Sequence, residues 1–412
     1  MSKQPKEKYV KHFVFSVYLL TIFQLIYYKY EFNYAIFQIL WLSCLAIMVY
    51  SAYYLLTDQK IESRYFRIVF TLFLLYESLT IFRGLLYNTN PNADELWFLI
   101  SRTHILWPFI IPLMVFFTKD LTIFSLLFSW FYKFGLVFLV MCILVPEVIT
   151  QRVLADMIII AMVTGSGYYL MFSAYLEKKR ANLAFIVLMV GIISFSILAR
   201  RSDLFTLLAI LVSAYFLSLK TTLKPNVFRY FPVFITLIVI ILISNGSIYS
   251  TLTSRLEQRL TEDSRSYVVE FFWLSLQDDF LLGKGLNGTY YCPIGGELED
   301  EGVIFAELEF REVIENGYLQ LMLTGGLIHL LLFLLVLIPA AILGIFYSSN
   351  LFARASGVVV LLWLIDMLLY GVPMLRINYI FVWICVGICY KSTLRKKTNE
   401  EINQEFQENL VI

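Results

Sequence analysis

Arginines and an acid–amide pair outside the apolar runs are the residues of this chain best suited to chemistry. Arg200 and Arg201 lie in a very short turn between two apolar runs, and Arg265 lies in the longest polar segment. Guanidinium groups bind phosphate oxygens through paired hydrogen bonds, so these arginines are suited to holding a pyrophosphate. Glu315 and Asn316 directly precede a long apolar run. A carboxylate there is suited to taking a proton from an attacking hydroxyl group.

The same residues also have plain structural interpretations. The arginine pair can extend to the membrane–water boundary, with Asp203 as its partner. Glu315 can cap the following helix and favour its dipole, or pair with Arg311 one turn earlier. Glu312, also one turn away, is a rival candidate for the base. The sequence leaves these alternatives open.

The composition places these residues in a membrane protein. Of the 412 residues, 59% are hydrophobic and 15% are charged, whereas about 25% are charged in a typical soluble domain. The chain is therefore predicted to be an all-α, polytopic transmembrane bundle in contact with membrane lipids. The net charge of +1, with no single basic patch, argues against nucleic acid as a partner. The spacing of the cysteines and histidines indicates no metal site, and no cofactor is expected.

About twelve apolar runs approach the ~20 residues that cross a bilayer. These runs cover residues 12–28, 34–56, 66–87, 98–118, 122–146, 153–176, 182–199, 203–219, 229–245, 317–347, 352–372 and 376–392. The predicted regions are nine transmembrane helices, one large external loop with short helices, three further helices and a cytoplasmic tail, over residues 1–245, 246–316, 317–392 and 393–412.

The distribution of basic residues predicts the sidedness. More than half of the 32 lysines and arginines fall at the N-terminus, in alternate loops and in the tail. Because positive charge is retained on the cytoplasmic side, both termini are predicted to be cytoplasmic and the 246–316 loop external. The first apolar run lacks a small-residue cleavage site, so we interpret it as a retained anchor. The few external arginines, Arg376 among them, are exceptions to the charge bias and need a reason.

Other charged and loop segments have simpler interpretations. Glu77 and Arg83 share one apolar run, where structural pairing explains them as well as function does. In the loop, residues 254–280 are predicted to form a helix on the membrane surface. The sequence LLGKGLNG is predicted to be a turn, and EGVIFAELEF a short hairpin.

Three features together resemble the superfamily of O-antigen polymerases and O-antigen ligases. They are the arginines in an outer turn, a long external loop with Ser-Arg followed by LLGKG, and ENGYLQLMLTGGL before a long helix. These motifs span roughly residues 194–336, and the topology covers the whole chain. The resemblance implies a GT-C-like, metal-independent membrane glycosyltransferase. Its donor and acceptor would be oligosaccharides linked to polyprenyl pyrophosphate, with a chain-length regulator protein as a further partner.

The resemblance also assigns roles to single residues. The arginines would hold the pyrophosphate leaving group, Glu315 would act as the catalytic base, and Asn316 would orient a sugar hydroxyl. The implied substrate-binding residues are Arg200, Arg201, Arg265, Asn316 and Tyr318. Ligases of the superfamily usually have His-Asn where this chain has Glu315-Asn316, and the external loop contains no histidine.

This departure favours a polymerase that joins lipid-linked repeats into O-antigen or a related surface polysaccharide, at the outer face of a bacterial inner membrane. A ligase that transfers finished polymer to lipid A–core is the second expectation. A flippase or transporter of the lipid-linked sugar is the third.

Overall fold

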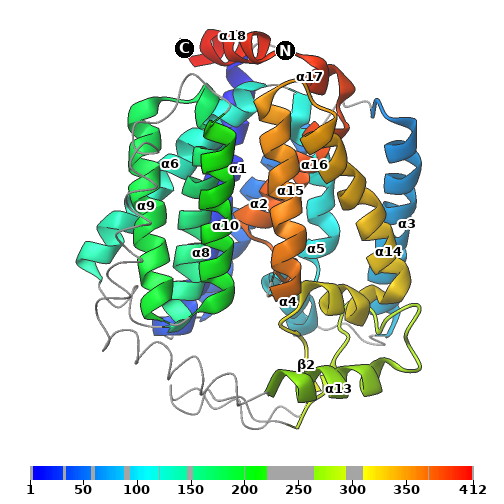
Figure 1. The fold of residues 1–412 in the computed structure, drawn as a ribbon. Helices are drawn as coiled ribbons and strands as arrows, with labels where there is room; N and C mark the ends of the chain where they lie inside the picture. The colour runs from blue at the N-terminus through cyan, green and yellow to red at the C-terminus, as the bar shows by residue number, and fades with distance from the viewer. Residues whose placement is uncertain are drawn as a thin grey trace, which may run out of the picture.

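A computed structural model describes residues 3–30, 34–56, 61–87, 93–119, 121–145, 152–198, 200–219, 264–293, 310–369 and 371–410. These residues are mostly helical and form an upright bundle with a smaller helical segment across one end (Figure 1).

The first half of the bundle contains α1 (Lys3–Tyr30), α2 (Tyr34–Leu56), α3 (Arg64–Tyr87), α4 (Ala93–Ser101), α5 (Trp107–Ile110), the 3-10 helix η1 (Ile111–Lys119), α6 (Leu121–Leu144), α8 (Arg152–Met171), the 3-10 turn η2 (Ser173–Tyr175), α9 (Lys178–Ile197) and α10 (Arg201–Ser218). The second half contains α13 (Ser264–Leu276), β1 (Tyr290–Tyr291), β2 (Phe310–Arg311), α14 (Gly317–Phe346), α15 (Leu351–Leu369), α16 (Ile377–Tyr390), α17 (Ser392–Lys396) and α18 (Asn399–Leu410).

Six helices in the described part of the chain are long and apolar enough to cross a membrane. They are Ile36–Leu56, Arg64–Leu85, Ile123–Leu144, Lys178–Ser196, Gly317–Phe346 and Leu351–Leu369. Four shorter apolar helices lie among them. The chain is thus an all-α protein with several membrane-type helices, as the composition predicted. The number of crossings and their sidedness stay predictions, and the expected span at 229–245 lies outside the described residues.

The expected span at 98–118 is not one helix, and this prediction was wrong. The segment is divided into α4, a turn at 102–106, α5 and η1. Pro108 lies in the first turn of α5, and Pro112 follows in η1. Because proline has no backbone N–H and its ring clashes with the preceding turn, one regular helix cannot continue through both positions. The indole of Trp107 donates to the carbonyl of Ile100 (2.8 Å) across the turn.

Helix α16 is short and lies inside the bundle. All 14 of its residues are buried, and Trp383 lies against Phe73 and Phe333 with ring centroids 5.6 and 5.9 Å away. Its length is about 21 Å, so it is ~9 Å too short to cross a hydrocarbon core of ~30 Å. A helix surrounded by protein does not need to span the bilayer, because its neighbours cover its ends. Its first turn and Arg376 are therefore expected to lie below the membrane surface.

Helix α14 is broken at Gly326, where φ is 67° and ψ is −169°. The LLGKG segment docks on this break. The amides of Lys284 and Gly285 donate to the carbonyls of Leu323 and Thr324 (2.7 and 2.9 Å). In return, two amides that follow the break donate to the carbonyls of residues 280 and 281. The predicted turn therefore supplies the hydrogen bonds that the broken helix cannot make within itself.

Arg83 and Glu77 do not pair with each other. Arg83 donates to the carbonyls of Leu282 and Gly283 (2.8 and 3.0 Å), which fastens α3 to the docked turn. Glu77 instead lies beside His329 of α14, with 3.8 Å between Oε1 and Nε2, and both residues are at most 2% exposed. Arg83, one of the arginines predicted to be external, thus has a structural role.

The described part of the external loop is smaller and differently paired than predicted. Helix α13 covers Ser264–Leu276, and the expected helical residues 254–263 lie outside the described residues. Strand β2 pairs antiparallel with β1, with Tyr290 opposite Arg311. Phe310 pairs with Tyr291, which lies 19 residues earlier in the chain, before the acidic run. The prediction had placed the partner of this strand within EGVIFAELEF.

The two chain termini lie at one end of the bundle, and α13 lies at the other (Figure 1). This arrangement agrees with the predicted placement of both termini on one side and the loop on the other. We expect Gln277→Cys to react with an impermeant thiol reagent in intact spheroplasts and Lys179→Cys not to react; both positions are exposed. A Cys142→Ser background removes the one native cysteine that is not buried. Labelling of Lys179→Cys alone would reverse the assigned sides.

Candidate functional site

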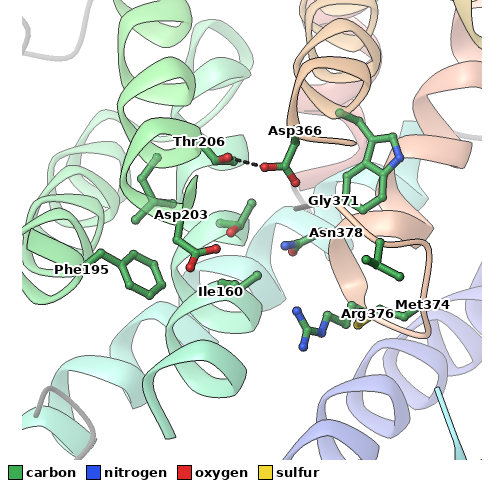
Figure 2. Close-up of a pocket in the computed structure, with 13 residues that line it drawn as sticks. Ile160, Phe195, Asp203, Thr206, Asp366, Gly371, Met374, Arg376 and Asn378 are labelled. Carbon is green, nitrogen blue, oxygen red and sulfur yellow. Dashed lines mark hydrogen bonds between the residues drawn. The ribbon is translucent and has the colours of Figure 1, made fainter. Parts of the chain in front are cut away.

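A polar pocket lies between α8, α10, α15 and the segment that leads into α16 (Figure 2). Its polar lining comprises Thr164, Asp203, Thr206, Asp366, Arg376 and Asn378. Within a bundle of apolar helices, so many polar groups at one place are typical of a functional site. We refer to it as the aspartate–arginine pocket.

Two aspartates approach the pocket from different helices. Asp203 lies in the first turn of α10, and Thr206 follows it by three residues, so both project from one side of the helix. The hydroxyl of Thr206 donates to a carboxylate oxygen of Asp366, near the end of α15 (Figure 2). Asp203 and Asp366 are also close enough to repel each other electrostatically. A neighbouring cation would offset this repulsion.

Arg376 supplies such a cation. It occupies the N-cap position of α16 in an extended conformation, and its side chain is half-buried. Its guanidinium attracts both Asp203 and Asp366. Because α16 begins inside the bundle, the arginine is held at the pocket and not at the outer surface. The sequence placed Arg376 among the unexplained external arginines, and that signal could have identified it as a site residue.

The predicted arginine pair is only partly described by the structure. Arg200 occupies the N-cap position of α10, is half-buried and attracts Asp203. Its backbone amide donates to the carbonyl of Phe195 (3.0 Å), which closes the tight turn. Arg201 is the first residue of α10 and Arg265 the second of α13, but their side chains lie outside what the structure describes. Asp203 is therefore a partner of Arg200, as the structural interpretation proposed.

Glu315 also belongs to the neighbourhood of the pocket. Its side chain is exposed, and its charge acts on Asp203. Glu315 does not occupy the cap position, because Asn316 is the N-cap of α14. The capping role considered for Glu315 therefore belongs to Asn316. The structure brings Glu315, Arg200 and the newly identified Arg376 around Asp203.

Asn316 and Tyr318 hold α14 against α15. Oδ1 of Asn316 accepts from the amides of Tyr318 and Leu319 (both 3.1 Å), and Nδ2 donates to the carbonyl of Leu368 (3.1 Å). The Tyr318 hydroxyl donates to the carbonyl of Leu364 (2.6 Å). These contacts give both side chains a positioning role, and their contact with a substrate stays a prediction.

Close backbone contact at Gly317 completes this junction. A Cβ atom on Gly317 would lie 2.3 Å from the carbonyl oxygen of Gly371, which lines the aspartate–arginine pocket. Any larger residue would push the start of α14 away from the pocket.

No model of a known protein family matches the chain, and no curated protein matches it. The functional argument therefore rests on the residues and their arrangement.

A second pocket lies next to Glu312, the rival candidate for the base. Glu312 Oε2 lies 3.4 Å from Nε2 of His104, in the turn between α4 and α5. The hydrogen bond with His104 lowers the pKa of Glu312 against the opposing effect of burial, and the charge of Arg102 lowers it further. The external loop has no histidine of its own, but the fold supplies one from a segment about 200 residues earlier.

Among the described residues, no group of three or more His, Cys, Asp or Glu side chains is arranged to hold a metal ion. The side chains at and beside the two pockets offer guanidinium groups, carboxylates, one histidine and hydroxyl groups. Such a set can bind an anionic leaving group and accept a proton from a sugar hydroxyl.

Proposed function

We propose that this chain is a polymerase that joins oligosaccharide repeats carried on polyprenyl pyrophosphate at the outer face of a bacterial inner membrane. The observation that carries the proposal is the pocket lined by Arg376, Asp203 and Asp366, with Arg200 and Glu315 near enough to act electrostatically on Asp203. In the proposal, a lipid-linked pyrophosphate reaches Arg376 and Arg200 from the bilayer. The motifs that resemble the polymerase and ligase superfamily support the same reaction.

In the proposed reaction, a hydroxyl group of the acceptor sugar attacks the anomeric carbon of the donor sugar. The new glycosidic C–O bond forms as the bond between that carbon and the pyrophosphate oxygen breaks. Polyprenyl pyrophosphate leaves with the bonding electrons, and Arg200 and Arg376 stabilise its negative charge. Arg201 and Arg265 are proposed to assist them. The hydroxyl proton passes to a carboxylate base, for which Glu315 is the first candidate.

The acidic residues of the pocket have a separate task in this proposal. Two arginines next to three carboxylates do not form a purely cationic site. The carboxylates attract the guanidinium groups electrostatically and offer acceptors for sugar hydroxyls. Binding of pyrophosphate then has to compete with this attraction for the arginines.

A transporter of the same lipid-linked sugar is the second candidate. Two observations favour it: the segment at 93–119 is broken, and Glu77 and His329 form a buried pair inside the bundle. Broken helices and buried ionisable pairs are common along transport pathways. Neither residue of this pair lines the aspartate–arginine pocket, and the polymerase remains the first proposal.

The surface polysaccharide of a deletion strain separates these candidates. A polymerase deletion is expected to leave the lipid core bearing a single repeat. A bare core with accumulated lipid-linked polymer would indicate a ligase, and lipid-linked single repeats retained on the cytoplasmic side would indicate a transporter. An unchanged polysaccharide ladder would contradict all three.

A further inference from the structure

We infer that the pocket beside His104 and Glu312 is a second sugar subsite, which receives the acceptor sugar and places one of its hydroxyl groups against the histidine–carboxylate pair. The inference rests on the proposed function and deepens it, because a polymerase needs separate places for donor and acceptor. The residues that line this acceptor pocket are Phe98, His104, Ile105, Leu286, Asn287, Gly288, Thr289, Glu312 and Gln320.

The chemistry of the lining of the acceptor pocket suits a sugar ring. Phe98 contributes an aromatic ring to the lining. Thr289 contributes a hydroxyl group and Asn287 an amide group, and each can both donate and accept hydrogen bonds. Within the described part of the chain, neither polar side chain makes a hydrogen bond, so both are free to meet a ligand. A lipid chain would not use such groups.

The histidine–carboxylate pair is held in place by its surroundings. Gln320 donates to the backbone carbonyl of Glu312 (3.2 Å) and accepts from the amide of Ile314 (2.9 Å), which fixes the segment that carries the carboxylate. The guanidinium of Arg102 lies 5.1 Å from the centre of the Phe98 ring, at the edge of the same pocket. The carboxylate of Glu312 is therefore directed at His104 by contacts that do not depend on a ligand.

This geometry equips His104 to accept a proton. Glu312 stays ionised near neutral pH because its pKa is lowered. An ionised carboxylate accepts only, so Nε2 of His104 carries the hydrogen that it donates. In the neutral imidazole, Nδ1 is then an acceptor for the proton of a hydroxyl group. This is the arrangement in which a carboxylate orients a histidine base.

The acceptor pocket and the aspartate–arginine pocket are adjacent. The segment from Glu312 to Asn316 runs from one to the other, with Glu315 near the second. The backbone amide of Leu375, beside Arg376, donates to the carbonyl of Thr103, beside His104 (2.8 Å). A transfer between two lipid-linked sugars needs the attacking hydroxyl close to the donor carbon. Two neighbouring pockets suit such a transfer.

Protection of His104 from chemical modification tests the inference without a mutation in the pocket. The chain has three histidines; His12 is exposed and His329 is 1% exposed. In a His12→Gln background, diethylpyrocarbonate is expected to modify His104 alone, as read from its peptide by mass spectrometry. The probe is the repeat-unit oligosaccharide released by mild acid from the lipid of the deletion strain. At ten times its Kd it should slow the modification about tenfold.

The controls separate a sugar subsite from other causes of protection. Polyprenyl pyrophosphate without sugar, and maltose at the same concentration, should leave the modification rate of His104 unchanged. Asn287→Ala should weaken the protection by the oligosaccharide, since it removes one ligand contact and leaves the histidine–carboxylate pair in place. Equal protection by maltose, or none by the oligosaccharide at any soluble concentration, would overturn the inference.

Elongation of lipid-linked repeats in the same purified preparation keeps the two proposals distinguishable. Elongation without protection of His104 would overturn the acceptor subsite and leave the polymerase in place. Protection without elongation would support the sugar subsite and contradict the polymerase. If both hold, His104→Gln is expected to raise the KM for the lipid-linked acceptor and lower kcat, whereas His12→Gln changes neither.

Discussion

Arg376→Ala is expected to abolish polymer formation while the protein remains folded in the membrane. Arg376 is the cation that attracts both aspartates of the pocket, and the short helix α16 places it inside the bundle. In the proposed reaction it stabilises the charge that develops on the leaving pyrophosphate. Loss of one such preorganised donor lowers kcat by roughly 10²–10³-fold. The measurement is the rate at which the purified protein elongates lipid-linked repeats.

Two further variants make this result specific. Arg376→Lys keeps the positive charge but cannot form the paired hydrogen bonds of a guanidinium, so we expect it to recover only a minor part of the rate. Arg180→Ala is the matched control, because Arg180 forms a surface pair with Glu177 (3.0 Å) on the predicted cytoplasmic side. Such pairs contribute about 0–1 kcal/mol. Arg180→Ala should therefore leave both elongation and the thermal midpoint unchanged.

A wild-type elongation rate in Arg376→Ala would remove this arginine from the proposed mechanism. A lost rate together with a lowered thermal midpoint would indicate a structural role in offsetting Asp203 and Asp366. Asp203→Asn separates these cases, because it reduces the repulsion between the aspartates and should restore the midpoint of Arg376→Ala but not its rate.

Gly326→Ala is expected to be the most destabilising single substitution in the half of the bundle that carries α13. Gly326 has φ 67° and ψ −169°, a conformation open essentially to glycine alone. An added Cβ would also lie 2.3 Å from the backbone of Leu281 and 2.5 Å from the amide of Gly283. Backbone strain and overpacking together predict a loss of about 2–6 kcal/mol in the free energy of unfolding.

The effect should be local as well as global. The contacts at risk are the backbone hydrogen bonds between residues 280–285 and the broken turn of α14. Exchange of the amide hydrogens of Lys284 and Gly285 should therefore accelerate more than exchange in α6. Gly165→Ala is the control, since its new Cβ would meet only side-chain atoms, at 3.1 Å. An equal fall in thermal midpoint for both variants would contradict the proposed role of the docked turn.

Local features of the sequence were enough to predict the class of protein and to single out Arg200 and Glu315 as candidate site residues. Long apolar runs determine membrane helices because each helix satisfies its own backbone hydrogen bonds, whatever its neighbours are. Arg200 and Glu315 could be identified because each stands at the edge of such a run. Pro108 and Pro112 were a local signal for the break at 93–119, but the apolar composition of the segment led to the prediction of one continuous helix.

The sequence by itself therefore determined an all-α membrane protein with an arginine turn and an acidic residue ahead of α14. Only the tertiary structure decided what these residues face. It placed Arg376 and Asp366 beside Asp203, and it paired His104 with Glu312 from a distant segment. Periodicity and charge bias report the environment of a residue within its own helix, whereas partners across the bundle depend on how helices pack and where they break. Here those breaks, at Gly326 and before α16, bring distant polar groups together inside an apolar bundle.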